Sequence, residues 1–201
     1  RCGDGSMVAD LALNQVRVPA THVLAEDYSA LLAVTDANDV TRVMQAAELL
    51  GVMRRALATT IEYLNTRKQF GRAIGSFQAL KHRTVDAYVQ VELSSACVNE
   101  VLGLLEQGGT LSTLASRAKA RCTHAALMVT RMAIQFHGAM GYTDECNIGL
   151  YFKRAMQLSS WLGNVDAHRA RYLKEAPPEP KAEAGSGVNA FAQDADWDNM
   201  P

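Results

Sequence analysis

The stretch Arg67-Lys-Gln-Phe-Gly-Arg-Ala-Ile-Gly-Ser-Phe-Gln-Ala-Leu-Lys-His82 separates two long helical patterns, and the rest of the chain can be understood from it. Gly71 and Gly75 interrupt the helical pattern, because glycine is the usual residue at helix ends. We expect Phe70 and Phe77 to anchor the connecting loop to a core, and Gln78 to open the next helix. The stretch therefore predicts a short connection between two helices.

The same stretch also has the chemistry of an anion site. It combines the guanidinium of Arg67, the carboxamides of Gln69 and Gln78, and glycines next to a helix N-terminus. Arginine binds phosphate oxygens in a fork, and the free N–H groups at a helix N-terminus favour anions. On composition alone two interpretations stay open: a site for a phosphate and a sugar, or a plain helix–helix connection.

Helical periodicity covers most of the chain. The patterns span residues 36–65, 76–107, 112–137 and 144–174, and the last of them is broken near Gly163-Asn164. Asp36 or Asn38 is expected to cap the first helix, and Thr110 or Ser112 the third. Gly138 is expected to end the third helix. Four long helices with short connections predict a mainly α fold, an antiparallel four-helix bundle.

The chain before and after the bundle has a different character. Residues 7–18 alternate like short strands, with a candidate turn at Asn14-Gln15. An isolated hairpin is barely stable, so we interpret these strands as the remnant of a β domain that lies upstream of a chain starting at Arg1. The predicted domains are strands of a truncated β domain (1–30), the helical bundle (31–174) and a disordered tail (175–201) rich in Pro, Ala, Gly and acidic residues.

Composition argues against several classes of function. Lys and Arg total 20 against 21 Asp and Glu, so no net positive charge favours nucleic acid or an anionic membrane as the partner. The cysteines are widely spaced, which is typical of a reduced intracellular protein. No apolar run is long enough to span a bilayer, and the histidines lack metal-ligand spacing. We therefore expect a cytoplasmic protein with no metal site and no membrane span.

Two blocks of sequence resemble the acyl-CoA dehydrogenase family. Arg67-Lys-Gln-Phe-Gly71, followed by Ser76-Phe-Gln-Ala79, is similar to the family's flavin-contacting segment. Gln135-Phe-His-Gly-Ala-Met-Gly-Tyr-Thr143 is similar to its Gln-x-x-Gly-Gly-x-Gly-Tyr/Phe-Thr segment. The order and approximate spacing of the blocks also match, and the similarity runs from about Asp4 to Leu173. The resemblance implies the family's C-terminal helical domain, preceded by its middle β domain.

The resemblance implies FAD as the cofactor and an acyl-CoA as the substrate. The residues it assigns to FAD, some of them reaching a neighbouring subunit's flavin, are Arg67, Gln69, Phe70, Gln78, Gln135, Gly138, Ala139, Asn164 and Asp166. Ala139 departs from the family's second glycine, where the backbone approaches phosphate. The family's Asp-x-x-Arg corresponds to Asp39 and Arg42, so Arg42 is expected to be the substrate-side cation and Asp39 its polar support.

The most informative departure concerns the catalytic base. Trp161-Leu-Gly-Asn-Val-Asp166 lies where the family has Tyr-Glu-Gly-Thr-x-Gln, whose glutamate removes the α-proton of the thioester while the flavin accepts a hydride from the β-carbon. The position of that glutamate is Leu162 here. Some branches of the family place the glutamate on the first long helix, and that position is Thr41 here. Neither side chain is a base at neutral pH.

Three interpretations follow from the missing base. In the first, the chain is the base-less half of a heteromeric dehydrogenase. In the second, Glu48 or Asp166 is a displaced base. In the third, the chain is not a dehydrogenase and is a helical interaction module without FAD. The segment from Tyr151 to His168 resembles the small-subunit type of pimeloyl-CoA dehydrogenase, which favours the first.

We therefore predict an FAD-dependent acyl-CoA dehydrogenase that makes a trans-enoyl-CoA. It would work within a homo- or hetero-tetramer and pass electrons to an electron-transferring flavoprotein. The alternative is a non-catalytic assembly subunit that only completes a partner's FAD site.

Overall fold

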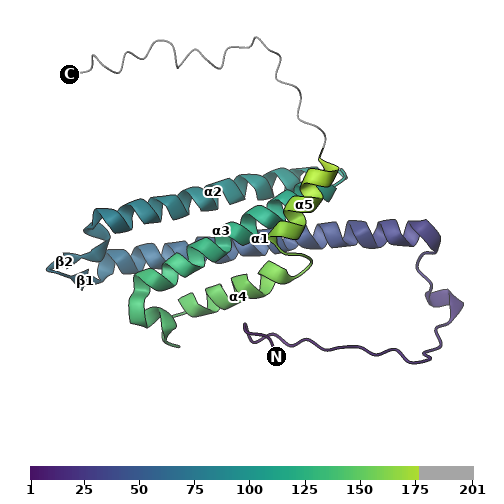
Figure 1. The fold of residues 1–201 in the computed structure, drawn as a ribbon, viewed down its shortest axis with the longest axis horizontal. Coiled ribbons are helices and arrows are strands. Elements are labelled where there is room, and N and C mark those ends of the chain that lie inside the picture. Colours follow the sequence, from purple (N-terminus) through teal and green to yellow (C-terminus); the bar gives the residue numbers. More distant parts are fainter. Residues whose placement is uncertain (177–201) are drawn as a thin grey trace, which may run out of the picture.

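The computed structural model describes residues 1–176 and consists mainly of helices (Figure 1). The helices are α1 (Asp27–Thr66), α2 (Gln78–Glu106), α3 (Ser112–His137), α4 (Ile148–Ser160) and α5 (Val165–Glu175). The short 3-10 helices are η1 (Ala20–His22), η2 (Ile74–Ser76) and η3 (Gly138–Tyr142). The two strands of the described chain are β1 (Lys68–Gln69) and β2 (Arg72–Ala73). The predicted mainly α fold is confirmed.

The first four helices form the predicted antiparallel bundle. Successive helices from α1 to α4 run in alternating directions, and α5 crosses α3 steeply at one end (Figure 1). Helix α3 contacts every other helix. The predicted break at Gly163-Asn164 separates α4 from α5: Gly163 has φ +113°, and the Asn164 side chain accepts a hydrogen bond from the N–H of Ala167. None of the helices in residues 1–176 is long and apolar enough to cross a membrane.

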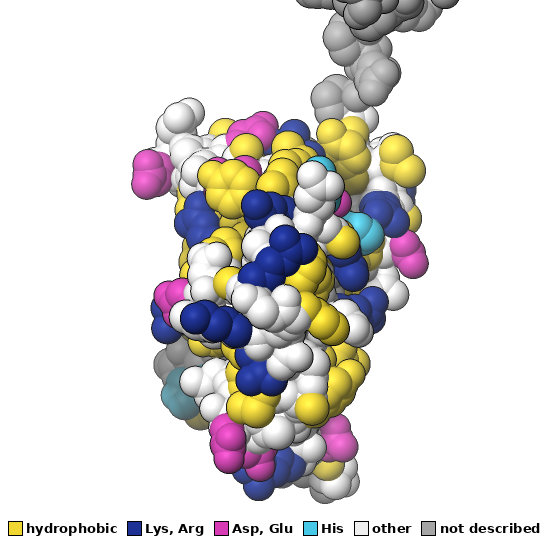
Figure 2. Space-filling model, turned by 90° about the vertical axis from the view of Figure 1, so that its left-hand side faces the viewer, with side chains coloured by type: hydrophobic (Ala, Val, Ile, Leu, Met, Phe, Trp, Pro, Cys, Tyr) yellow, Lys and Arg dark blue, Asp and Glu magenta, His cyan; other side chains and the backbone are white. Residues whose placement is uncertain are grey.

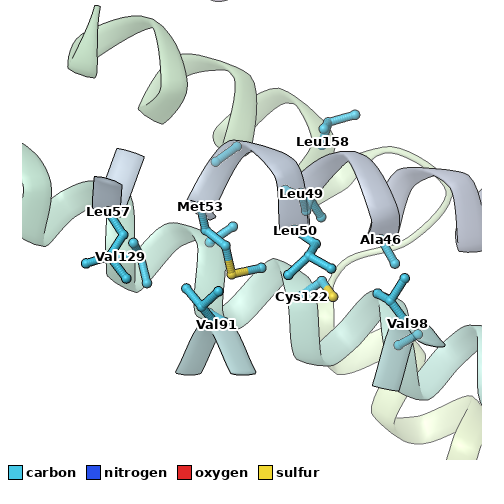
Figure 3. Close-up of a cluster of buried hydrophobic side chains, with 14 of the residues drawn as sticks. Ala46, Leu49, Leu50, Met53, Leu57, Val91, Val98, Cys122, Val129 and Leu158 are labelled. Carbon is cyan, nitrogen blue, oxygen red and sulfur yellow. The ribbon is translucent and has the colours of Figure 1, made fainter. Parts of the chain in front are cut away.

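The core lies where α1, α2 and α3 meet (Figure 3). The buried face of α3 carries small residues such as Ala118, Cys122 and Ala125, which let α1 approach closely. Leu49 and Met53 of α1, both fully buried, fill the space between the helices. Burying a side chain of this size stabilises the fold by roughly 1.5–3 kcal/mol, so this seam fixes the relative positions of α1 and α3.

Two predicted helix starts need correction. Helix α1 begins at Asp27, so Asp36 and Asn38 lie inside it and cannot cap it. Residues 27–35 contain no Gly or Pro that would stop the helix, and its first turns are largely exposed. Helix α3 begins at Ser112 as predicted, but its N-cap residue is Leu111 and no side chain caps it. The predicted end at Gly138 is confirmed, with φ +59°.

The strands predicted at residues 7–18 do not form. These residues are almost all exposed, and no other strand of the described chain lies beside them. A short strand needs a partner strand in a sheet or a packed face, and this segment has neither within residues 1–176. The assignment of residues 1–30 to a β domain stays a prediction, although α1 already begins within that range. The predicted tail lies outside the described residues from 177 onward, whereas Glu175 still belongs to α5.

Candidate functional site

The stretch between α1 and α2 folds into a tight hairpin. Lys68 pairs with Ala73 and Gln69 with Arg72, so Phe70 and Gly71 form a two-residue turn. Both turn residues have positive φ, +53° and +78°. Such turns favour glycine and asparagine, so Phe70 adopts a backbone conformation that is uncommon for a bulky residue. The hairpin was not predicted, because strands of two residues are too short to show alternation.

The prediction that Phe70 anchors the loop to a core is wrong. Phe70 is 88% exposed, and its ring meets the edge of Phe77 at a centroid distance of 6.0 Å. Phe77 is half-buried, with the Arg72 guanidinium 4.2 Å above its ring. A two-residue turn projects beyond the bundle, which leaves the Phe70 ring without a core to enter.

The other predicted FAD contacts of this stretch, Arg67, Gln69 and Gln78, are exposed as well. Figure 2 shows the hairpin end of the bundle, where Lys and Arg side chains lie among apolar ones. These residues line neither of the two large cavities described below. They are therefore accessible to solvent at the surface.

A cavity of about 760 Å³ lies between α2, α3 and the start of α5. It brings together Gln135 and Asp166, two of the predicted cofactor residues. Its walls are Arg83, Asp86, His124, Leu127, Met128, Arg131, Met132, Gln135, Val165, Asp166 and Arg169. Three guanidiniums, a carboxamide and apolar side chains suit a ligand that carries both phosphate and a planar ring system. These donors fit FAD.

A second cavity, also about 760 Å³, lies beyond the end of α3 and is enclosed by η3 and α4. Gln135 and Arg131 line both cavities and stand between them. Gly138 and Ala139, predicted to contact FAD, begin η3 and are exposed. Close packing shapes this loop, because a Cβ on Gly141 would lie 2.9 Å from the carbonyl oxygen of Ile134.

The predicted substrate-side pair forms a buried ion network. Asp39 is 3% exposed, and its Oδ1 accepts a hydrogen bond from Arg42 at 2.7 Å. Arg171 of α5 binds the same carboxylate in a fork, at 2.5 and 2.8 Å. Burial alone would raise the pKa of Asp39, but the hydrogen bonds from Arg171 and Arg42 outweigh it and hold the pKa below its ordinary value. Arg171 is the residue that the sequence did not reveal.

Arg42 contacts one of the two family positions for the catalytic base and follows the other in sequence. The Nε of Arg42 donates to the carbonyl oxygen of Leu162 at 3.4 Å, and Thr41 precedes Arg42 on α1. Leu162 is half-buried in the turn between α4 and α5 and has φ +56°. The Thr41 hydroxyl donates to the carbonyl of Ala37 at 2.8 Å. Arg42 thus links α1 to the Leu162 turn, and neither Thr41 nor Leu162 carries a carboxylate.

The candidate displaced bases have other partners. Both oxygens of Glu48 accept hydrogen bonds from Arg154, at 2.6 and 3.1 Å. The Asp166 side chain is 86% exposed and lies 3.6 Å from Arg169. A base poised for catalysis is usually shielded from water, whereas Asp166 is solvated and Glu48 is held in an ion pair. Neither environment is typical of a catalytic base.

Two buried basic groups lie close to the Leu162 turn. Lys119 of α3 is fully buried, and its Nζ donates to the carbonyl of Leu158 at 2.5 Å in the last turn of α4. Burial lowers the pKa of Lys119 to about 8. His168 is 3% exposed, and burial, followed by the nearby Arg42, Lys119 and Arg171 cations, lowers its pKa to about 4. Among residues 1–176, no group of three His, Cys, Asp or Glu side chains is arranged to hold a metal ion.

The buried Lys119 predicts a rise in stability with pH. Its pKa is about 8 in the folded state against an ordinary 10.5, so between these values the unfolded chain binds more protons and stability rises with pH. Burial raises the pKa of Cys122 to about 12 from 9.0, which opposes this trend above pH 9. Between pH 8 and 9, the free energy of unfolding should rise more in the wild type than in Lys119→Met, by at most ~1.4 kcal/mol. Urea unfolding at both pH values measures this. An equal change in the free energy of unfolding from pH 8 to pH 9 in the two proteins would contradict it.

Comparison with known proteins places the chain in a family. The model of the acyl-CoA dehydrogenase C-terminal domain matches residues 32–176. Acyl-CoA dehydrogenase IpdE2 of Mycolicibacterium smegmatis is 42% identical over 125 residues, which cover 62% of this chain and 39% of that protein. The chain thus spans about two fifths of the length of the curated relatives that it matches.

Solved structures agree with the family match. Butyryl-CoA dehydrogenase from Megasphaera elsdenii superposes with a TM-score of 0.75 at 26% identity, covering 78% of this chain and 41% of that one. The steroid acyl-CoA dehydrogenase variant Tcur3481-Tcur3483 gives a TM-score of 0.66 at 34% identity, covering 68% and 38%. The chain therefore belongs to the acyl-CoA dehydrogenase family.

Proposed function

We propose that this chain supplies the helical part of an acyl-CoA dehydrogenase and is the subunit that lacks the catalytic base. The observation that carries the proposal is the hydrogen bond from Arg42 to the carbonyl oxygen of Leu162, which places a residue without a carboxylate beside the predicted substrate-side cation, while Thr41, just before Arg42, offers no carboxylate either. The ion network around Asp39 holds Arg42 in place, which supports the assignment of Arg42 as the substrate-side cation. A partner chain would supply the base, and an electron-transferring flavoprotein would receive the electrons.

The chain's own residues would hold FAD from two directions. The exposed hairpin residues Arg67, Gln69 and Phe70, with Gln78 just beyond, are accessible to a cofactor held by a neighbouring subunit. Gln135 lies in the first cavity, where the arginines of its walls can bind phosphate oxygens. FAD, when bound, supplies the hydride acceptor. The exposed backbone at Gly138 and Ala139 adds a surface against which phosphate can pack.

Asn164 and Asp166, at the α4–α5 turn, would contribute to FAD binding in different ways. The Asn164 side chain caps α5, so its contribution to FAD binding would be indirect, through the position of that helix. Asp166 follows in the first turn of α5 and lines the first cavity. A carboxylate there accepts hydrogen bonds from ribose hydroxyls more readily than it tolerates phosphate. We therefore assign Asp166 to the sugar rather than to the pyrophosphate.

The test uses the intact protein, purified alone and loaded with FAD. Under anaerobic conditions a panel of acyl-CoAs is added, and the flavin absorbance is followed. Bleaching that requires a second, co-encoded subunit supports the base-less role. Bleaching by the protein alone contradicts it and directs attention to Glu48 and Asp166. A protein that binds no flavin, alone or with a partner, contradicts the wider proposal.

The alternative is an assembly subunit that completes a partner's FAD site without turnover at its own. The absence of a carboxylate at Thr41 and Leu162 fits this role equally well. The number of flavins that substrate reduces in the heteromer distinguishes the two roles. If substrate bleaches only the flavin of the partner's site, and blocking the first cavity of this chain leaves turnover unchanged, the assembly role is supported.

Phe70→Asn should separate stability from cofactor binding. Asparagine tolerates positive φ better than phenylalanine, so the thermal midpoint should stay the same or rise slightly. If the exposed Phe70 ring contacts FAD, the affinity for FAD should fall about tenfold, since stacking on an aromatic side chain contributes roughly 1–3 kcal/mol. Fluorescence titration of the apoprotein with FAD measures this. Tyr28→Asn, which removes another exposed aromatic ring, is the control and should bind FAD normally.

A further inference from the structure

A cleft between α3 and α5 gathers basic side chains next to the first cavity. It has a volume of about 340 Å³. Its walls are Arg117, Ala120, Arg121 and His124 of α3, and His168, Arg169, Tyr172 and Leu173 of α5. Five of these eight residues are Arg or His, and none is Asp or Glu. The composition of the walls is that of a site for an anion.

The positive charges of the cleft arginines are only partly neutralised by carboxylates of the described chain. Arg121 donates to the uncharged amide oxygen of Gln90 at 2.7 Å, and no carboxylate of the described chain forms an ion pair with it. Arg117 pairs with Glu100, which lies on α2 outside the cleft. The ion pair of Arg169 is with an exposed carboxylate, and water screens such pairs. The cleft therefore keeps a net positive charge.

Two buried N–H donors of these walls lack an acceptor. The Nε atoms of Arg117 and Arg121 are buried and have no hydrogen-bond partner in the described chain. The two residues are four apart on α3 and so share one face of the helix. Native proteins seldom leave buried donors unpaired, so the guanidiniums of Arg117 and Arg121 are incompletely hydrogen-bonded within residues 1–176.

We propose that this cleft binds a small organic phosphate. Guanidiniums match phosphate oxygens in geometry and charge, while Ala120, Tyr172 and Leu173 offer apolar walls to the group attached to the phosphate. The volume is near the lower limit of known ligand sites, roughly 300–1,000 Å³, which suits one phosphorylated group rather than a whole dinucleotide.

The cleft and the flavin cavity are separate sites that adjoin. His124 and Arg169 line both. Arg121 and Gln135, however, are about 21 Å apart along α3, from a rise of about 1.5 Å per residue. A ligand held by Arg121 would therefore not occupy the position of the predicted flavin contact at Gln135. The site goes beyond the proposed function and does not depend on it.

The experiment titrates the intact, FAD-loaded protein with phenyl phosphate in a calorimeter. We expect saturable binding at one site per chain. Arg121→Gln should weaken the affinity at least tenfold, while Arg55→Gln, an equal charge change at an exposed position on α1, should leave it unchanged. Unchanged helical content and a similar thermal midpoint in both variants would show that each is folded.

Three results would overturn the assignment. The first is equal affinity in Arg121→Gln and the wild type. The second is benzoate binding as tightly as phenyl phosphate, because the cleft would then accept carboxylates, such as acidic side chains of a neighbouring protein segment. The third is loss of phenyl phosphate from the apoprotein when FAD is added, which would make the cleft an extension of the flavin site.

Discussion

Replacing Asp39 by Asn is expected to destabilise the bundle by about 3–5 kcal/mol, because it leaves two guanidiniums without their shared anion. Asp39 is buried, and the side chains of Arg42 and Arg171 are only 17% and 21% exposed. Removing one charge of such a network costs more than the network contributes, since the remaining charges are only partly hydrated. Urea unfolding at pH 7 measures the loss of stability.

The control for this change is Asp36→Asn, three residues earlier on α1. Asp36 is exposed, so its replacement should alter the free energy of unfolding by less than about 0.5 kcal/mol. The pH dependence supplies an independent check. The folded-state pKa of Asp39 lies below its ordinary 3.8, so its contribution is present above that value and is lost as pH falls through the lowered pKa. The difference between wild type and Asp39→Asn should therefore shrink in acid. A difference that stays constant to pH 2 would show that Asp39 is not held as an anion.

This network shows what the sequence could and could not predict. Asp39 and Arg42 are three residues apart, so helical geometry places them on one face and the pair could be predicted. Arg171 is separated from Asp39 by 132 positions, and only the crossing of α5 over α3 brings it there. Nothing in the local pattern around Arg171 distinguishes it from Arg169, the solvated arginine of the same helix. Long-range contacts between charged groups need the tertiary fold.

Local signals were reliable for the helix ends that glycine sets, and less so elsewhere. Gly138 ends α3 as predicted, because a left-handed residue is needed at that point and glycine provides it. The caps were wrong, because Asp36 and Asn38 are tolerated inside a helix once α1 has begun upstream. Lys119 could have been noticed from the sequence: Ala115, Lys119 and Cys122 recur at helical spacing, and all three are buried. A lysine on that stripe is a sign of a buried cation.

The second large effect is a gain of function. Leu162→Glu is expected to let the FAD-loaded chain bleach with acyl-CoA in the absence of any partner subunit. The change introduces a carboxylate at the position where the family has its base, next to Arg42, whose guanidinium would keep it ionised. Leucine and glutamate have similar preferences at the φ of +56° found here, so the turn should not change. A positioned general base contributes about 10²–10⁴-fold, and the rate of bleaching should rise by at least about a hundredfold.

The substrate for this test is the acyl-CoA that is oxidised when the co-encoded subunit is present, so that its fit is already known. Trp161→Glu is the matched control, because it adds the same charge one position earlier on a side chain that is 52% exposed. It should leave the flavin oxidised. If both variants bleach, the added charge acts through general electrostatics and not as a base. If neither does, although the heteromer turns over, the α-proton of the substrate is not within reach of Leu162. The base position would then be Thr41 or lie wholly on the partner, and Thr41→Glu separates those two cases.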